Sequence, residues 1–182
     1  MCKVRIKGLI FIVLLVMLVG CGQIQSEKID KGSEGKVVSV LADGRSYLSF
    51  SWIEQGYKGF FVPVNQKIGQ TESEIREGGK PDSEGHYEGG HFLQYENVTY
   101  FINPKTKRNV AIAIDIRGKK LTVSNLKRTL GTPDQSEFNE MDGLWMFVYE
   151  LGDYDLMFEA PSEHADLTHA WLKERNKSRT YR

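Results

Sequence analysis

The sequence is short of cysteine, of net charge and of long apolar stretches, and each shortage excludes a class of protein. Its 182 residues include only Cys2 and Cys21, too few for a disulfide framework or a thiolate zinc site. Lys plus Arg and Asp plus Glu balance at 24 each, so the basic surplus typical of nucleic-acid-binding domains is missing. The longest apolar run, residues 9–19, has 11 residues, whereas a membrane-spanning helix needs roughly 20.

What is present has the composition of a globular protein, with 40% hydrophobic and 26% charged residues. A chain of this length normally folds as one domain, which we place at residues 36–172. The last ten residues, 173–182, are polar and contain five cations. We interpret them as a solvated basic tail, the alternative being contact with anionic lipid or wall polymer.

Residues 1–20 have the features of a lipoprotein signal peptide. Lys3, Arg5 and Lys7 precede the apolar run, which ends in Leu-Val-Gly before Cys21. This ending resembles a bacterial lipobox, so we expect cleavage before Cys21 and a diacylglycerol on its thiol. An N-acyl group such as palmitate on the new amino terminus is a further option. The alternative is an uncleaved amino-terminal anchor with an incidental cysteine.

Either alternative places the domain outside the cytoplasmic membrane, and we expect it at the outer face, held by lipid. Removing residues 1–20 takes away three cations and no acid, so the mature chain carries a net charge of −3. Residues 21–35 are rich in Gly, Ser, Gln, Glu and Lys, which predicts a flexible tether with a reach on the order of 20 Å. We expect no cofactor beyond the lipid, no metal and no nucleic-acid partner.

A four-residue turn motif divides the domain into two repeats. Residues 79–82, Gly-Lys-Pro-Asp, recur 52 positions later as Gly-Thr-Pro-Asp at 131–134. A short helical pattern precedes each copy, with Thr71 and Glu74 at capping-box spacing in the first. In the second, Thr122 is the predicted cap of a helix ending at Gly131.

Strand patterns follow each motif, and they predict an antiparallel meander in each repeat. The expected strands are residues 91–96, 98–103 and 110–116 in repeat one (46–117), and 144–150, 154–159 and 166–172 in repeat two (118–172). We expect a helix at residues 46–55, with Leu48 and Trp52 inward, and an extended lead-in at 60–64. The predicted fold is therefore α+β, with two helix-plus-meander repeats sharing one sheet and helices on one face.

Several motifs occur in a distinctive order: Ile-Gly-Gln-Thr at 68–71, the two Gly-x-Pro-Asp turns, Ile-Asp-Ile-Arg at 114–117, Tyr149, and Thr-His at 168–169. This order resembles the YjgB-like family of Gram-positive lipoproteins, a domain of unknown function. More distantly, the tandem architecture is similar to β-lactamase-inhibitor protein and to the SmpA/OmlA lipoproteins. The resemblance spans about residues 46–172 and implies a BLIP-like fold. It implies no established activity.

Alternation along two predicted strands identifies a candidate binding face. In residues 144–149 one face of the strand carries Trp145, Phe147 and Tyr149. In residues 110–117 one face carries aliphatic residues, and the opposite face carries Asp115 and Arg117. We expect the aliphatic sets to meet the helices, which would leave the aromatic set near Asp115, Arg117, Asp155 and His169. Aromatic and Arg side chains on an open face are typical of binding hot spots.

Two alternatives stay open for this face. The amino-terminal segment, whose Tyr57, Phe60 and Phe61 need partners, is an equally good cover for the aromatic rings. Asp115 and Arg117, two apart on one face, have a structural ion pair as their simplest explanation.

No catalytic or metal-binding motif is present: we find no nucleophile elbow, phosphate loop, His-Glu-x-x-His or dinucleotide fingerprint. We therefore expect no catalytic residues and no enzyme. The expected function is non-catalytic binding or scaffolding of an envelope protein or peptide through the aromatic sheet face. The alternative is an envelope hydrolase that uses carboxylates such as Asp155 and Glu159 with His169.

Overall fold

A computed structural model describes residues 47–87 and 89–176. The expected signal peptide, Cys21, the tether and the end of the basic tail lie outside the described residues. Among the residues described, no helix is long and apolar enough to cross a membrane.

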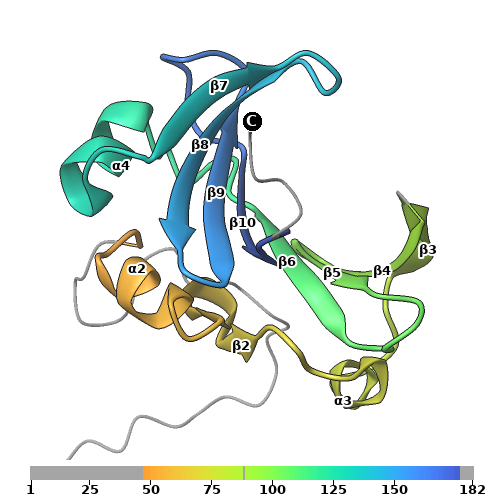
Figure 1. Ribbon diagram of the computed structural model, residues 1–182. Coiled ribbons are helices and arrows are strands. Elements are labelled where there is room, and N and C mark those ends of the chain that lie inside the picture. The colour runs from red at the N-terminus through yellow and green to blue at the C-terminus, as the bar shows by residue number, and fades with distance from the viewer. Residues whose placement is uncertain (1–46, 88, 177–182) are drawn as a thin grey trace, which may run out of the picture. The chain divides into compact units, whose positions relative to one another are not determined.

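Eight antiparallel strands form one sheet in the order β3-β4-β5-β6-β10-β9-β8-β7 (Figure 1). Their bounds are β3 Ser83–Tyr87, β4 Gly90–Tyr95, β5 Val98–Ile102, β6 Asn109–Asp115, β7 Gln135–Asn139, β8 Leu144–Leu151, β9 Tyr154–Ala160 and β10 His169–Glu174. Each set of four consecutive strands forms half of the sheet, and β6 of the first half pairs with β10 of the second. The predicted α+β class is confirmed.

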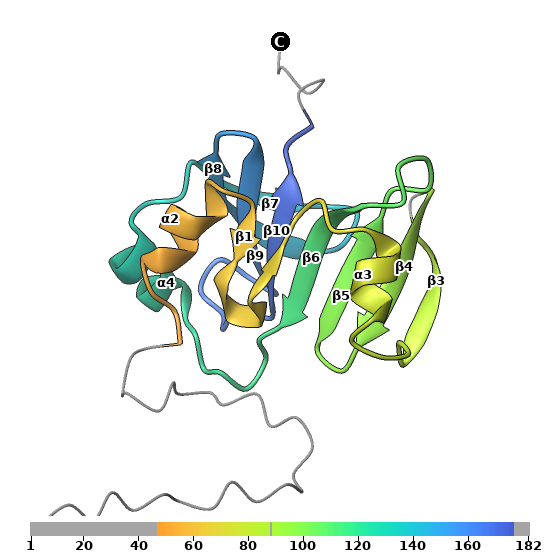
Figure 2. The same cartoon turned by 90° about the horizontal axis from the view of Figure 1, so that it is seen from below.

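Three short helices lie on one face of this sheet (Figure 2): α2 Ser51–Gly56, α3 Glu72–Arg76 and α4 Val123–Leu130. Thr71 and Glu74 form the expected capping box of α3. Thr122 caps α4 by accepting a hydrogen bond from Asn125 N, and Gly131 ends that helix with a φ of 91°. Gly is the residue that adopts this left-handed backbone without steric strain.

The helices and one sheet face enclose a single core. It includes the aliphatic face of β6, with Ile112, Ile114 and Ile116 almost fully buried, as predicted. Trp52 of α2 lies at its centre, stacked on Phe158 with ring centroids 5.8 Å apart. Such buried aromatic pairs contribute packing beyond their apolar area.

The Gly-x-Pro-Asp motif makes the same hydrogen bonds in both halves, which gives the repeat a physical basis. The carboxylate of Asp82 accepts from Glu96 N at 2.6 Å, and that of Asp134 accepts from Glu150 N at 2.7 Å. Each Asp therefore joins the start of its unit's first strand to the hairpin that follows.

A tyrosine completes each motif from the second strand of its unit. Tyr95 donates its hydroxyl proton to the Gly79 carbonyl oxygen at 3.2 Å, and Tyr149 donates to the Gly131 carbonyl at 2.9 Å. We call the two helix-plus-strand halves of the molecule unit one (α3 and β3–β6) and unit two (α4 and β7–β10).

The structure departs from the expected elements in five places, the last of which is the lead-in at residues 60–64. Each unit has four strands rather than three, because β3 and β7 directly after the Pro-Asp turns were not predicted. Strand β10 begins at His169 and runs to Glu174, three residues later and two residues further than expected. Helix α2 begins only at Ser51.

The extended lead-in at 60–64 is wrong in its second half. After β1, Phe60–Phe61, the chain forms the 3-10 turn η1, Val62–Val64, and returns as β2, Gln66–Lys67. Pro63 lies within this turn, where its fixed φ suits a helical start.

Candidate functional site: the open face of the sheet

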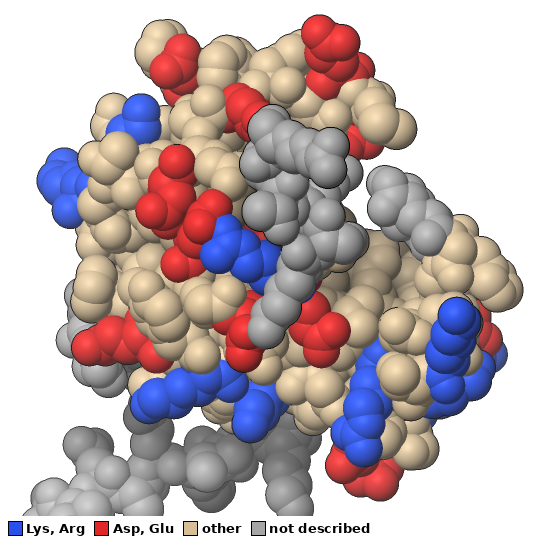
Figure 3. Space-filling view, viewed as in Figure 1, with Lys and Arg blue, Asp and Glu red and all other residues tan. Residues whose placement is uncertain are grey.

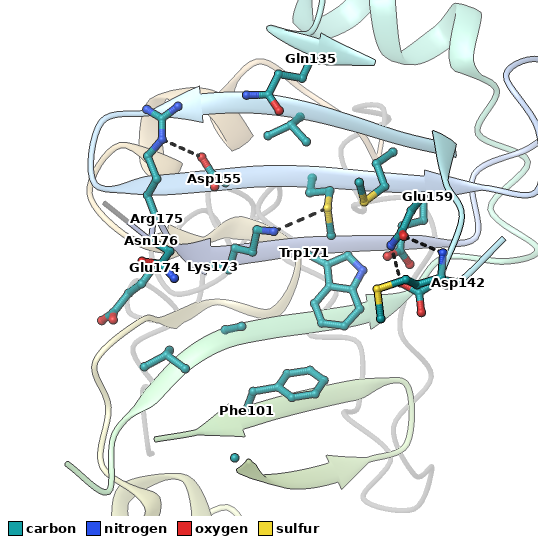
Figure 4. Close-up of a pocket in the computed structure, with 18 of the residues that line it drawn as sticks. Phe101, Gln135, Asp142, Asp155, Glu159, Trp171, Lys173, Glu174, Arg175 and Asn176 are labelled. Carbon is teal, nitrogen blue, oxygen red and sulfur yellow. Dashed lines mark hydrogen bonds and ion pairs between the residues drawn. The ribbon is translucent and has the colours of Figure 1, made fainter. Parts of the chain in front are cut away.

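The sheet face away from the helices carries a hollow of about 940 Å³ (Figure 4). It is lined by β6, β7, β8, β9 and β10, by the β7–β8 turn, by the start of β4 and by the end of β5 with the residues that follow it. None of the described residues that line it belongs to a helix. Its volume is at the upper end of the range for ligand pockets. We call it the hollow below.

The lining is acidic on balance. Of the described residues that line the hollow, two are cations, Lys173 and Arg175, and seven are carboxylates: Glu137, Glu140, Asp142, Glu150, Asp155, Glu159 and Glu174. Figure 3 shows acidic side chains gathered over the unit-two side of this view. Such a surface attracts cations and repels anions.

Strand registers arrange the open-face side chains in three rows across the sheet. The first row runs Asp115, His169, Glu159, Met146 and Glu137; the second runs Thr99, Ala113, Trp171, Met157, Val148 and Gln135; the third runs Phe101, Ala111, Lys173, Asp155 and Glu150. The middle row is mostly apolar, and a carboxylate-rich row lies on each side of it. The hollow therefore has an apolar floor between acidic borders.

Two aromatic rings meet over small residues on this face. Phe101 of β5 and Trp171 of β10 stack with centroids 5.2 Å apart and an interplanar angle of 29° (Figure 4). They come from strands on opposite sides of β6, where Ala111 and Ala113 face the same side. Since an alanine leaves space above a strand, the two larger rings can lean across it and meet.

Glu159 is the most buried carboxylate of the open face, with a fractional exposure of 8%. Burial raises the pKa of its carboxyl, partly offset by the Trp171 indole N–H and by His169 nearby. His169 Nδ1 lies 3.5 Å from Glu159 Oε2, but no hydrogen bond satisfies this nitrogen. The Trp171 indole N–H is close enough to lower the pKa, yet it is not aligned for a regular hydrogen bond.

Asp155 lies at the other end of β9 on the same face. Burial raises its pKa as well, against the opposing effects of Lys173 and Arg175. Arg175 Nε is 3.5 Å from Asp155 Oδ1, and that oxygen has no hydrogen-bond partner. The same guanidinium pairs with Glu150. Arg175 is therefore shared between two carboxylates, and Lys173, the cross-strand neighbour of Asp155, is the second cation near it.

The predicted aromatic binding face is the covered one, which corrects the assignment of Trp145, Phe147 and Tyr149. Phe147 is fully buried, Tyr149 is 4% exposed, and both belong to the core. Trp145 is half-buried on the same side, beside Phe138. The amino-terminal segment provides the cover, through Trp52 and Phe61 rather than Tyr57, which is exposed. The sequence misled here because both alternating sets of this strand are apolar.

The neighbouring strand contained the signal that assigns the faces. In β9, Asp155 and Glu159 share one face and Leu156 and Phe158 the other, so the charged set marks the open side. Register pairs Met146 with Glu159, and this places Met146 on that side and the aromatic rings on the other. The predicted site omits Trp171, whose strand runs from His169 to Glu174 rather than over the predicted residues 166–172.

The remaining predicted residues lie on the open face but outside the hollow lining. Arg117 donates from Nε to Asp115 Oδ2 at 2.9 Å, and this structural ion pair confirms the simpler expectation for the two residues. It holds the pKa of the Asp115 carboxyl below its usual range. His169 is the cross-strand neighbour of both Asp115 and Glu159.

The described lining of the hollow offers apolar contacts and carboxylates to a bound molecule. That described lining contains no Ser, Thr or Cys that could act as a nucleophile. Asp155 and Glu159 are four residues apart on one strand, about 13 Å along it, whereas paired glycosidase carboxylates lie about 5–9.5 Å apart. In the described part of the chain, no group of three or more His, Cys, Asp or Glu residues is arranged to hold a metal ion.

Fold and site together define an α+β protein whose eight-stranded sheet is covered by helices on one face and bears an acid-bordered apolar hollow on the other. No model of a known protein family matches the chain, and no curated protein does. Among solved structures, a DUF4309 family protein (YjgB) from Bacillus subtilis is similar, with a TM-score of 0.57 and 17% identity. The match covers 70% of this chain and 98% of that one, and at this identity it shows a shared fold alone.

Proposed function

We propose that this protein is a lipid-anchored, extracytoplasmic binding protein that holds a protein or peptide in the hollow without catalysis. The observation that carries the proposal is the apolar row of Trp171, Met157 and Val148 between two rows of partly uncompensated carboxylates. Apolar and aromatic surface supplies affinity, and charges at its border select the partner and its orientation. The likeness to β-lactamase-inhibitor protein supports the use of a sheet face for binding, by analogy of fold only.

The anchor is proposed on sequence grounds alone: Cys21 and the residues before it lie outside the described part of the chain. In a Gram-positive host, Cys21→Ala should leave the chain at precursor mass and without lipid, measured by mass spectrometry of the membrane fraction. The same cleaved and acylated product from this variant would contradict the assignment.

One observation favours the hydrolase alternative: the raised pKa of Glu159 next to His169 is the kind of shift that general acids show. Against it stand the distance between Glu159 and Asp155 and the lack of a nucleophile among the described lining residues. The binding proposal uses the same carboxylates as charge partners, for which no bond need break.

The binding proposal is tested by site-specific photo-crosslinking of the full chain in its host. A photoreactive residue replaces Glu137, exposed at the border of the hollow on β7, or Glu54, exposed on α2 in the helix layer. We expect a discrete adduct from position 137 and none from position 54. The adduct should disappear in a Trp171→Ala background that still melts cooperatively.

Two results would contradict the proposal. Equal adducts from both positions would indicate non-specific contact in the envelope. An adduct from position 137 that survives Trp171→Ala, or no adduct there at all, would show that the hollow is not the contact surface.

A further inference from the structure

The open-face side chains of β9 form a simple alternating series. Asp155, Met157 and Glu159 point into the hollow at every second residue, so a carboxylate lies on each side of a thioether. Strand geometry places successive members about 6.6 Å apart and the two carboxylates about 13 Å apart. An extended segment laid along β9 has the same period, so its alternate side chains would face the three members one to one.

The centre of the series provides an apolar seat. Met157 lies between Trp171 on β10 and Val148 on β8 in the middle row. The Trp171 ring is steadied by its stack on Phe101. An apolar side chain entering at this point would contact the Trp171 ring, the Met157 thioether and Val148, with the Lys173 Nζ 3.8 Å from the Met157 sulfur at the edge of the seat. Aromatic rings such as Trp171 are enriched in interface hot spots.

The two ends of the series carry charge that the chain itself compensates only in part. Asp155 has Lys173 across the strand pair and shares Arg175 with Glu150, yet one of its oxygens has no hydrogen bond. Glu159 has His169 at 3.5 Å, again without a hydrogen bond. Buried charge is costly unless it is paired, so an arriving cation is stabilised at both ends.

We propose that the hollow takes an extended segment of a partner protein in which two Lys or Arg side chains, four residues apart, flank an apolar side chain at the middle. This inference rests on the proposed binding function and deepens it by naming the partner's chemistry. Charge complementarity commits the site to a cationic partner, because carboxylates outnumber cations in the described lining by seven to two. Long Lys and Arg side chains also suit carboxylates that lie on the floor of a hollow.

The test uses the full chain, solubilised in mild detergent, and two synthetic nonapeptides with blocked ends. Their central five residues are Lys-Ser-Leu-Ser-Lys in the ordered peptide and Lys-Lys-Leu-Ser-Ser in the permuted one, so charge and composition are identical. Fluorescence anisotropy at physiological salt should give an affinity about tenfold higher for the ordered peptide, which equals about 1.4 kcal/mol.

Isosteric variants locate the interaction. Glu159→Gln and Asp155→Asn remove one end each and should each lower the affinity for the ordered peptide about tenfold. They should leave the affinity for the permuted peptide nearly unchanged. Glu54→Gln, an exposed carboxylate in the helix layer, is the matched control and should change neither affinity.

Equal affinities for the two peptides, or no binding of either to folded protein, would overturn the inference. If the crosslink from position 137 is still present in that case, the proposed function stands and only the partner's pattern is wrong. If both fail, the hollow is not a binding site.

Other occupants have their own signatures. Ending the chain at Asn176 removes the basic residues that follow. A tenfold gain in peptide affinity from this truncation would assign the hollow to the chain's own tail and overturn the proposal. Sedimentation that shows a dimer, dissociated by Glu159→Gln, would assign the hollow to a second copy and overturn it equally.

Discussion

Unit one and unit two use the same hydrogen bonds but differ in what covers them. Tyr149 of unit two is buried beneath the amino-terminal segment, next to Phe158. Tyr95 of unit one makes the matching bond but stays partly exposed, under the five-residue helix α3. The Asp and Tyr bonds therefore shape each unit, whereas the depth of the core depends on α2, which belongs to neither unit.

The units also differ on the open face. Registers of the tyrosines and their neighbours align Thr99 and Phe101 of β5 with Met157 and Glu159 of β9. Unit one therefore presents uncharged side chains where unit two presents a buried carboxylate. The same backbone supports a structural surface in one half and the proposed binding surface in the other, which is how function is commonly placed on a repeated fold.

The largest effect should come from removing the cover of unit two. Trp52→Ala deletes a fully buried ring that contacts Phe158 and Phe61, and it should cost about 3–5 kcal/mol in the free energy of unfolding. Ile75→Ala in α3, the corresponding cover of unit one, should cost about 2 kcal/mol. Denaturant unfolding followed by circular dichroism measures both. Equal losses in the free energy of unfolding for the two variants would contradict the conclusion that unit two is more deeply covered than unit one.

An intermediate effect should separate the two tyrosines. Tyr149→Phe removes the hydroxyl that donates to Gly131 in a buried setting, and it should cost about 1.5 kcal/mol. Tyr95→Phe removes the longer, more exposed bond to Gly79 and should cost no more than about 0.5 kcal/mol. The same unfolding measurement applies. A larger loss at Tyr95 would mean that unit one, not unit two, depends on this bond.

The smallest effect concerns two carboxylates of unit two whose pKa values move in opposite directions. Burial raises the pKa of Glu159, so ionisation at neutral pH opposes folding and Glu159→Gln should raise the melting temperature at pH 7 by about 2 °C. Below the pKa of an unfolded Glu, both states are protonated, so this gain should vanish toward about pH 3.

Glu150 provides the matched control because Arg175 and Gln135 lower its pKa. Its stabilising effect is present above the pKa of an unfolded Glu and is lost as the pH falls through its folded value. Glu150→Gln should therefore lower the melting temperature at pH 7, with the difference closing in acid. Differential scanning calorimetry from pH 3 to pH 7 compares the two variants. A shift of the same sign for both would contradict the two environments described here.

The elements near strong local signals could be predicted from the sequence. Caps such as Thr71 and Thr122 bond to atoms three residues away, so their spacing is visible in the chain. Strands β3 and β7 carry mostly polar residues at the two edges of the sheet, where pairing on one side suffices and no apolar alternation is required. Pairing with the next strand along the chain, β4 or β8, is what makes them strands.

For a similar reason, only some of the site residues could be predicted from the sequence. The sequence identifies Asp155, Glu159 and His169 as candidate site residues because their side chains are chemically distinctive. The register of β8 against β9 decides which residues of β8 share a face with these side chains, and that register is a property of the tertiary structure. The stack of Phe101 on Trp171 joins residues 70 positions apart and leaves no trace in local sequence.

The pairing of Ala113 with Trp171 has a consequence for how such a surface can arise. The registers relate the two units by a local two-fold axis that passes between these residues, so each occupies the position of the other. In a symmetric dimer of separate chains, one gene would place the same residue at both positions: two indoles competing for one space, or two methyl groups leaving a gap. When the two units belong to one chain, one position can hold a small side chain while the equivalent position holds a large one. The proposed binding surface can therefore be asymmetric at a local two-fold axis, because both units belong to one chain and their residues can differ.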